Sequence, residues 1–357
     1  MLDSLQKARQ LAEMVRYSGD TLRSRGEGHA SSTEHIRSLF AQTGLQVTHS
    51  VTPSLAASLD KVYERLHIPQ GTVDAFVYSS PEIQAECYAG STKDCVIQFS
   101  SGLIDLLDGD DIEFVAGHEI GHFLLRHGIT KLESHCENLE YFMQQRSQEI
   151  SVDRIGLLAC RSLDIAIRAL MKTVSGLTSK HLRFDVGTFI SQLRNVGNLQ
   201  IDHAITSSHP SILVRCRALL WFSLNDFYTQ GETHFSQEQL RKIDKHIEND
   251  LTKYVDGPAR KRIEEAKQNL TLWMAAYEAV QNGIFDKQEQ ANISGMFGEE
   301  MLNKLKNFIE GMSAADVQEE IFSRMQSARQ ELENIIPNSF EAEYAKIKLL
   351  FSAFNRS

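Results

Sequence analysis

Apolar and polar positions along the chain predict helices over most of its length and strands in one short region. Residues 1–50 have the spacing of two amphipathic helices separated by a polar break, and a third helix is expected from Ser54 to Leu66. The strand pattern occurs in three short runs, which cover residues 73–78, 83–89 and 95–100. Because no crossover helix fits between these runs, they predict a small antiparallel sheet.

Helical periodicity returns after Leu103. Asp110 and Glu113 have the spacing of a capping box and Gly128 has the position of a C-cap, which predicts a helix of about 17 residues between them. Another helix is expected from Leu139 to Arg161, with further helices as far as Tyr228.

A polar segment at 229–239 interrupts this pattern. Beyond it the sequence predicts a helical bundle with helices near 237–254, 258–282, 286–310, 313–335 and 340–354. We therefore expect N-terminal helices over 1–51, a central domain over 52–229 and a C-terminal helical domain over 230–357.

Composition narrows the class of protein. The 357 residues include 37 Lys and Arg against 47 Asp and Glu, and this net charge of −10 argues against nucleic acid as a partner. No apolar stretch reaches the ~20 residues that span a bilayer, so no transmembrane segment is expected. The cysteines show no CxxC spacing, which predicts reduced thiols and a cytoplasmic location. They are Cys87, Cys95, Cys136, Cys160 and Cys216.

The strongest chemical motif is His118-Glu119-Ile120-Gly121-His122, an HExxH sequence on a predicted helix. Two histidines at i and i+4 project from one helix face, so both ring nitrogens can reach one zinc ion. Glu119 points beside that face, where it can hold a metal-bound water. Gly117 and Gly121 predict close packing of a strand or a substrate against this helix. The alternative interpretation is an amphipathic helix whose histidines recur at core spacing.

A catalytic zinc site needs a third protein ligand and an open position for water. A third histidine six residues after His122 is absent, since Gly128 stands there, and His127 would lie about 180° around the helix from His118. Glu149 is a reasonable third ligand on the next helix, and Asp153 on the same face can orient a ligand imidazole. Glu133, Glu137 and Glu140 are nearer in sequence and compete with Glu149 for this role.

Three segments together resemble the zinc metallopeptidase family of HtpX and the CAAX prenyl endopeptidases. They are GHEIGH at 117–122, EISVDRIG at 149–156 and SHPS at 208–211 followed by Arg215. The family belongs to the gluzincins, which bind zinc through HExxH and a downstream glutamate. The resemblance covers roughly residues 52–225. It implies a predominantly helical α+β fold: a zincin-like metallopeptidase core with a small antiparallel sheet and an HExxH helix, followed here by a C-terminal helical bundle.

The resemblance also implies roles for individual residues. His118, His122 and Glu149 are implied as ligands of Zn²⁺, with Glu119 as general base and Asp153 behind the ligands. His209 matches a histidine that stabilises an oxyanion or covers the zinc at rest. Arg215 matches an arginine that pairs with acidic groups behind the site. Two features depart from the family pattern: Gln84 or Glu86 stands near the place of an edge-strand asparagine, and the transmembrane helices of the membrane members are missing.

The sequence therefore predicts a zinc-dependent endopeptidase in which Glu119 is the general base for a metal-activated water. An extended peptide or protein substrate would pair with the edge strand at Glu86, Cys87, Tyr88 and Ala89. The C-terminal helices are expected to bind a partner or to regulate access. One alternative is a latent or regulatory interaction protein whose zinc site is closed by His209, and another is a helical interaction protein with a chance motif.

Overall fold

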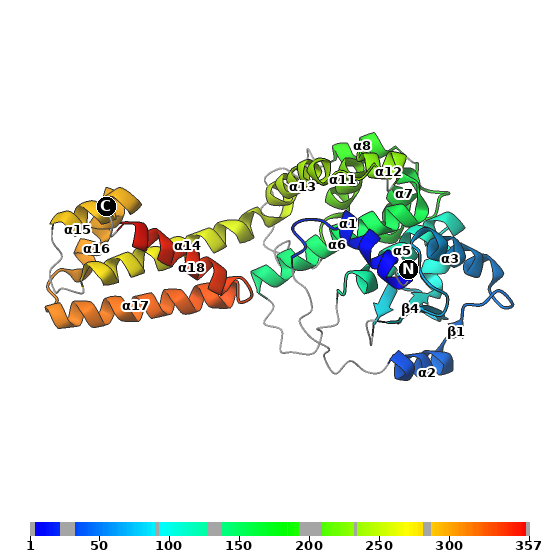
Figure 1. Cartoon of the computed structure of the whole chain (residues 1–357), viewed down its shortest axis with the longest axis horizontal. Coiled ribbons are helices and arrows are strands. Elements are labelled where there is room, and N and C mark those ends of the chain that lie inside the picture. The colour runs from blue at the N-terminus through cyan, green and yellow to red at the C-terminus, as the bar shows by residue number, and fades with distance from the viewer. Residues whose placement is uncertain are drawn as a thin grey trace. The chain divides into compact units, whose positions relative to one another are not determined.

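The structure is a computed structural model, and it describes residues 4–21, 33–89, 93–127, 138–183, 185–192, 209–231, 234–280 and 287–354. The chain forms two compact units, of which the first holds Met1–Cys136 and Met143–Val255. The second holds Glu137–Phe142 and Asp256–Ser357. Each unit has its own cluster of buried apolar residues, and Figure 1 shows the elements of both.

Helices make up most of the first unit, as the sequence predicts. They are α1 (Ser4–Val15), α2 (Thr33–Thr43), α3 (Pro53–Arg65), α4 (Ser101–Leu106), α5 (Gly109–Leu124), α6 (Leu139–Cys160), α7 (Leu163–Ser175), α8 (Val186–Ser191), α11 (Ile212–Ser223), α12 (Asp226–Gln230), α13 (Gln237–Leu251) and the π-helix η2 (Thr252–Asp256). The first residues of α6, up to Phe142, belong to the second unit.

A four-stranded sheet of order β1-β2-β4-β3 covers one side of the first unit. Its strands are β1 (Leu45–Gln46), β2 (Val73–Tyr78), β3 (Ala85–Tyr88) and β4 (Cys95–Ser100). The sheet is mixed, so the prediction of an antiparallel sheet is wrong: β4 runs parallel to β2 and antiparallel to β3. The parallel pair of β2 and β4 forms without a crossover helix. The chain returns through β3, which pairs with the opposite edge of β4. The short β1, which the sequence analysis does not predict, pairs antiparallel with β2.

Helix α5 lies at the centre of the first unit and packs against α1, α3, α7 and β3. Its N-cap is Asp108, whose backbone N–H donates to the Asp111 carboxylate at 3.1 Å. The predicted capping box of Asp110 and Glu113 is therefore wrong. Glu113 is buried and accepts hydrogen bonds from Lys61 and Arg65 instead. The predicted C-cap, Gly128, lies outside the described residues.

Small residues allow α5 and α6 to cross closely. A Cβ added to Gly117 would lie 2.3 Å from the Ala159 Cβ and 3.1 Å from the Gly156 Cα, both on α6. A Cβ on Gly121 would lie 3.0 Å from a methyl group of Val152, also on α6. The close neighbour is thus a helix, and the strand or substrate that the glycines alone predict is not what lies there.

The second unit is a helical bundle with its own core. It contains α14 (Gly257–Ala279), α15 (Lys287–Phe297), α16 (Glu299–Ile309), α17 (Ala314–Ile335) and α18 (Phe340–Phe354). The predicted single helix over 286–310 is two helices, because Gly298 has φ 85° and breaks the helical path. Leu270, Ile321 and Leu332 are fully buried in this core.

The unit boundary at Val255 differs from the boundary predicted at 229/230, because α13 packs with the first unit. Leu240, Ile243 and Ile247 join its apolar cluster, and Asp244 forms a buried ion pair with Arg154 of α6. The predicted separation of residues 1–51 also differs, since apolar residues of α1 join the same cluster.

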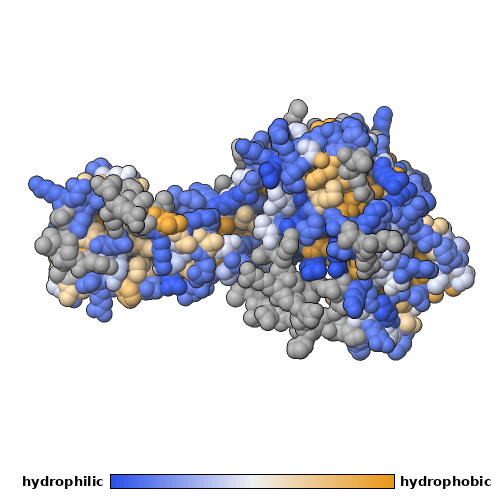
Figure 2. Space-filling model, viewed as in Figure 1, coloured by the Kyte–Doolittle hydropathy of each residue, from blue (hydrophilic) through white to orange (hydrophobic). Residues whose placement is uncertain are grey.

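Hydrophilic residues cover most of the described surface that faces the viewer in Figure 2. Among the described residues, no helix is both long and apolar enough to cross a bilayer.

Candidate metal centre

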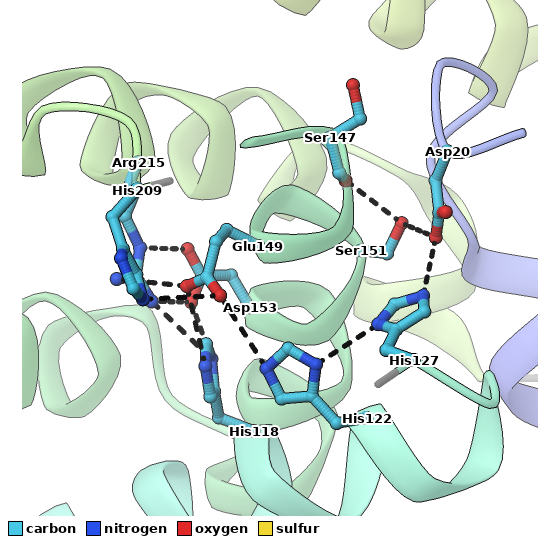
Figure 3. A network of polar contacts seen from close by, with 10 residues as sticks. All are labelled: Asp20, His118, His122, His127, Ser147, Glu149, Ser151, Asp153, His209 and Arg215. Atoms are coloured by element: carbon cyan, nitrogen blue, oxygen red, sulfur yellow. Dashed lines mark hydrogen bonds and ion pairs between the residues drawn. The ribbon is translucent and has the colours of Figure 1, made fainter. Parts of the chain in front are cut away.

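Three side chains from α5 and α6 converge inside the first unit (Figure 3). His118 and His122 lie one turn apart on α5, and Glu149 faces them from α6. His118 Nε2 lies 3.6 Å from Glu149 Oε2, and His122 Nε2 lies 3.6 Å from Glu149 Oε1. One potential ligand atom from each residue falls within 4.8 Å of the other two. The structure therefore brings together the three residues that the sequence analysis names as metal ligands.

The geometry and burial of this cluster suit a cation. Ligand atoms about 2.0–2.1 Å from a tetrahedral zinc lie roughly 3.3–3.4 Å apart, close to the N···O separations in the cluster. Glu149 Oε2 is buried and accepts no hydrogen bond from a described residue, although Arg215 Nη1 lies 3.3 Å away as an ion pair. A buried carboxylate oxygen without a donor is costly, and a metal ion would remove that cost. The residues present therefore fit a zinc ion.

His118 is oriented by a buried carboxylate behind it. Its Nδ1 lies 3.0 Å from Asp153 Oδ1, and Arg215 donates to both oxygens of Asp153 at 2.8 and 2.6 Å. Burial alone would raise the pKa of Asp153, but the charge and hydrogen bonds of Arg215, with a contribution from His118, hold that pKa at about 2. Asp153 thus remains an acceptor for His118 Nδ1–H, which leaves the Nε2 lone pair facing Glu149.

His122 is oriented by a different arrangement, which the sequence analysis misses. Its Nδ1 lies 3.2 Å from His127 Nδ1, and His127 Nε2 lies 3.0 Å from Asp20 Oδ2. The predicted position of His127, about 180° around the helix from His118, is wrong, because α5 ends at Leu124 and Arg126 has a left-handed φ of 61°. That turn brings His127 back against His122, although His127 is not one of the clustered ligands.

Glu119 lies beside the ligand face of α5 and is buried. Burial raises its pKa to about 7; His118 opposes the rise, while Glu149 and Glu86 add to it. A carboxyl group with a pKa near neutrality can accept and release a proton during one reaction cycle. Such a pKa beside a candidate metal site is typical of a catalytic group.

His209 lies at the exposed side of the cluster, with its side chain 62% exposed and its Nε2 3.5 Å from Glu149 Oε1. Ser208, which precedes it in the family-like motif, lies outside the described residues.

Of the competing acids, Glu140 belongs to the second unit, where its carboxylate accepts from the Asn338 backbone N–H and the Ser339 hydroxyl. It is therefore not part of the ligand cluster. Glu133 and Glu137 lie outside the described residues.

The predicted substrate strand is β3, which lies at the edge of the described sheet and packs on α5. Cys87 packs against the main apolar cluster, whereas the Tyr88 ring packs on Phe40 with ring centroids 5.2 Å apart. The Glu86 carboxylate accepts from Gln84 Nε2 at 2.7 Å. These side chains already make contacts within the protein, so β3 would offer a peptide mainly its backbone N–H and C=O groups. Ala89 lies just beyond the end of β3.

The fold and the cluster define a class of protein: an α+β domain in which two histidines and one carboxylate between packed helices could hold a metal ion. Within the chain, residues 49–144 match the family model described as Peptidase family M48. This stretch contains the HExxH motif and ends before Glu149. The chain is also similar to the plastoglobule-localized metallopeptidase 48, chloroplastic, of Arabidopsis thaliana, with 27% identity over 217 residues. That match covers 53% of this chain and 62% of the relative's length. The chain therefore spans less than two thirds of the length of this relative.

Proposed function

We propose that this protein is a zinc-dependent endopeptidase of the gluzincin type, related to HtpX and the CAAX prenyl endopeptidases. The proposal is carried by Glu149, whose buried Oε2 accepts no hydrogen bond from the described residues and lies 3.6 Å from His118 Nε2. The similarity to peptidase family M48 supports peptide bonds as the substrate class.

Zn²⁺ held by His118, His122 and Glu149 would supply a Lewis acid that activates water and polarises the scissile carbonyl. Glu119 takes the proton from the attacking water and later passes it to the leaving amine. Its buried position beside the ligand face of α5 supports this role. Asp153 and Arg215 keep the His118 imidazole in the orientation and tautomer that ligation requires.

The substrate would be a peptide or protein segment in extended conformation. It would add to the free edge of β3 around residues 86–89 through backbone hydrogen bonds, which fixes its direction before the chemistry. The position of β3 at the sheet edge and against α5 supports this mode.

A second candidate is a latent protein whose zinc site is closed by His209. The observation in its favour is that His209 Nε2 lies 3.5 Å from Glu149 Oε1, about as near as His122 Nε2 at 3.6 Å. In the enzymatic interpretation the same imidazole stabilises the oxyanion instead.

The remaining assignments are also proposals. The C-terminal helices would bind a partner or regulate access, and their separate apolar core supports an independent role. A cytoplasmic location is supported by the free thiols of Cys87, Cys95, Cys160 and Cys216. The net charge of −10 supports the absence of nucleic acid among the partners.

The test is the variant Glu119→Gln, assayed for zinc content and for cleavage of an unbiased peptide library. Loss of the base should lower the rate by about 10²–10⁴-fold while one zinc per chain remains, because Glu119 is not a ligand. Glu64→Gln, the same change at an exposed position, is the matched control. Cleavage at the wild-type rate by Glu119→Gln would refute the mechanism.

A further inference from the structure

Asp20 is a buried carboxylate that lies far from the HExxH motif in sequence and next to it in space (Figure 3). It is 1% exposed and belongs to the segment that follows α1, upstream of the stretch matched by the family model. Its Oδ2 lies 3.0 Å from His127 Nε2 and accepts from Ser151 Oγ at 2.8 Å. Its Oδ1 accepts from Gln144 Nε2 at 3.0 Å. A buried aspartate with this many donors holds a defined position.

One arrangement of protons satisfies these contacts and also allows His122 to bind a metal. His122 can bind a metal through Nε2 only if that nitrogen carries no proton, which places the proton on Nδ1. Nδ1–H then donates to His127 Nδ1 at 3.2 Å, and His127 can accept there only if its own proton is on Nε2. That Nε2–H donates to Asp20 Oδ2. A single assignment therefore satisfies all three side chains and leaves the Nε2 of His122 directed at Glu149.

Asp20 is fixed by the helix that carries the third ligand. Ser151 and Gln144 lie on α6 on either side of Glu149, and the Tyr17 backbone N–H also donates to Ser151 Oγ at 3.2 Å. Arg154, further along α6, donates to the Val15 carbonyl at 2.9 Å. The end of α1 and the segment after it are thus attached to α6 at several points, and the Asp20 carboxylate of this segment reaches His122 on α5 through His127.

We infer that Asp20, acting through His127, positions His122 for metal binding. Residues 16–21 therefore belong to the metal centre. The inference rests on the proposed function, because it assigns His122 as a ligand. The two histidines are then positioned in different ways. Asp153 contacts His118 directly, whereas Asp20 acts on His122 through the imidazole of His127.

The test uses the full-length chain with Asp20→Asn and, separately, His127→Phe, titrated with Zn²⁺ and with Co²⁺. Loss of either positioning residue should weaken Zn²⁺ binding by about 10–100-fold and change the visible spectrum of bound Co²⁺. Because the two residues act in series, the double variant should lose no more than the larger single loss. His127→Phe keeps the bonds between Asp20 and α6, so it remains informative if Asp20→Asn fails to fold.

Two further variants separate the possible outcomes. Asp244→Asn removes another buried anchor of the same segment, the acceptor of the Ser18 backbone N–H at 2.9 Å, without touching the histidines. It should lower stability but leave Zn²⁺ affinity and the Co²⁺ spectrum unchanged.

Glu149→Ala should abolish metal binding. If it does, while Asp20→Asn and His127→Phe bind both metals like the wild type, the positioning role is overturned and the metal site stands. Metal binding unchanged in Glu149→Ala would overturn the proposed site and, with it, this inference.

Discussion

His118 and His122 show how far the surroundings of a residue decide its chemistry. Burial would lower the pKa of His118, but the charge of Glu149 and the hydrogen bond and charge of Asp153 raise it above its usual value. Burial lowers the pKa of His122 well below its usual value, and the charges of His118 and His127 lower it further. Two identical side chains one turn apart thus differ in the direction of their pKa shifts, because Glu149 and Asp153 favour protonated His118 while His118 and His127 disfavour protonated His122.

His209→Ala distinguishes the two roles proposed for the exposed histidine. If His209 stabilises the oxyanion, the variant keeps its zinc and loses about 10²–10³-fold in kcat. If His209 closes the site, the variant gains activity, because it opens a coordination position. Measuring kcat and zinc content together decides between them, and unchanged kcat with unchanged zinc affinity would contradict both roles. Exposed His181→Ala in the first unit is the matched control.

At the scale of elements, the site depends on how closely α5 and α6 approach. Two of the proposed ligands lie on α5 and the third lies on α6, so the spacing between the helices sets the distance between the histidines and Glu149. Gly117 and Gly156 occupy the crossing, and a Cβ on Gly156 would lie 2.8 Å from the Phe114 carbonyl oxygen. Close packing of this kind leaves no room for a methyl group.

Gly117→Ala should therefore destabilise the protein by about 1–3 kcal/mol and weaken Zn²⁺ binding, because the added methyl group forces the helices apart. Urea unfolding of the metal-free protein and zinc titration measure the two effects. Gly109→Ala in the first turn of α5 is the control, since its added Cβ would meet only Ser58 Oγ at 3.4 Å. Wild-type stability and affinity in Gly117→Ala would show that the crossing does not set the site geometry.

At the scale of the whole molecule, the proposed ligands and the residues proposed to position them all belong to the first unit. The second unit has a separate apolar core around Leu270 and Ile321. Binding of a metal stabilises only the part of a protein that contains its ligands.

Calorimetry of the full chain should therefore show two unfolding transitions, and only one should depend on zinc. Free zinc at 100 times Kd adds about 2.7 kcal/mol to the stability of the unit that binds it. That gain should raise one transition temperature by roughly 5–10 °C. In Glu149→Ala, zinc should shift neither transition. If both transitions of the wild type shift together, the two units do not unfold independently.

Local patterns were sufficient for most helices and for the candidate ligands on α5. Periodicity of 3.6 residues identifies helices from neighbouring positions alone, and HExxH places His118 and His122 on one face wherever the helix goes. Glu149 could be named because it lies on a second helix in a pattern with Asp153. Gly298 is itself a local signal for a helix break. The helical pattern on both sides of it nevertheless predicted one continuous helix over 286–310.

The sequence by itself determined the helical class, three of the four described strands, the candidate ligands and the acidic net charge, because each depends on residue type and short spacing. Only the tertiary structure decided that β4 lies between β2 and β3, that α13 belongs with the first unit, and that Asp20 and His127 stand behind His122. These features depend on contacts between segments far apart in the chain. Their energies come from burial and from pairing of buried polar groups, which no short stretch of sequence contains.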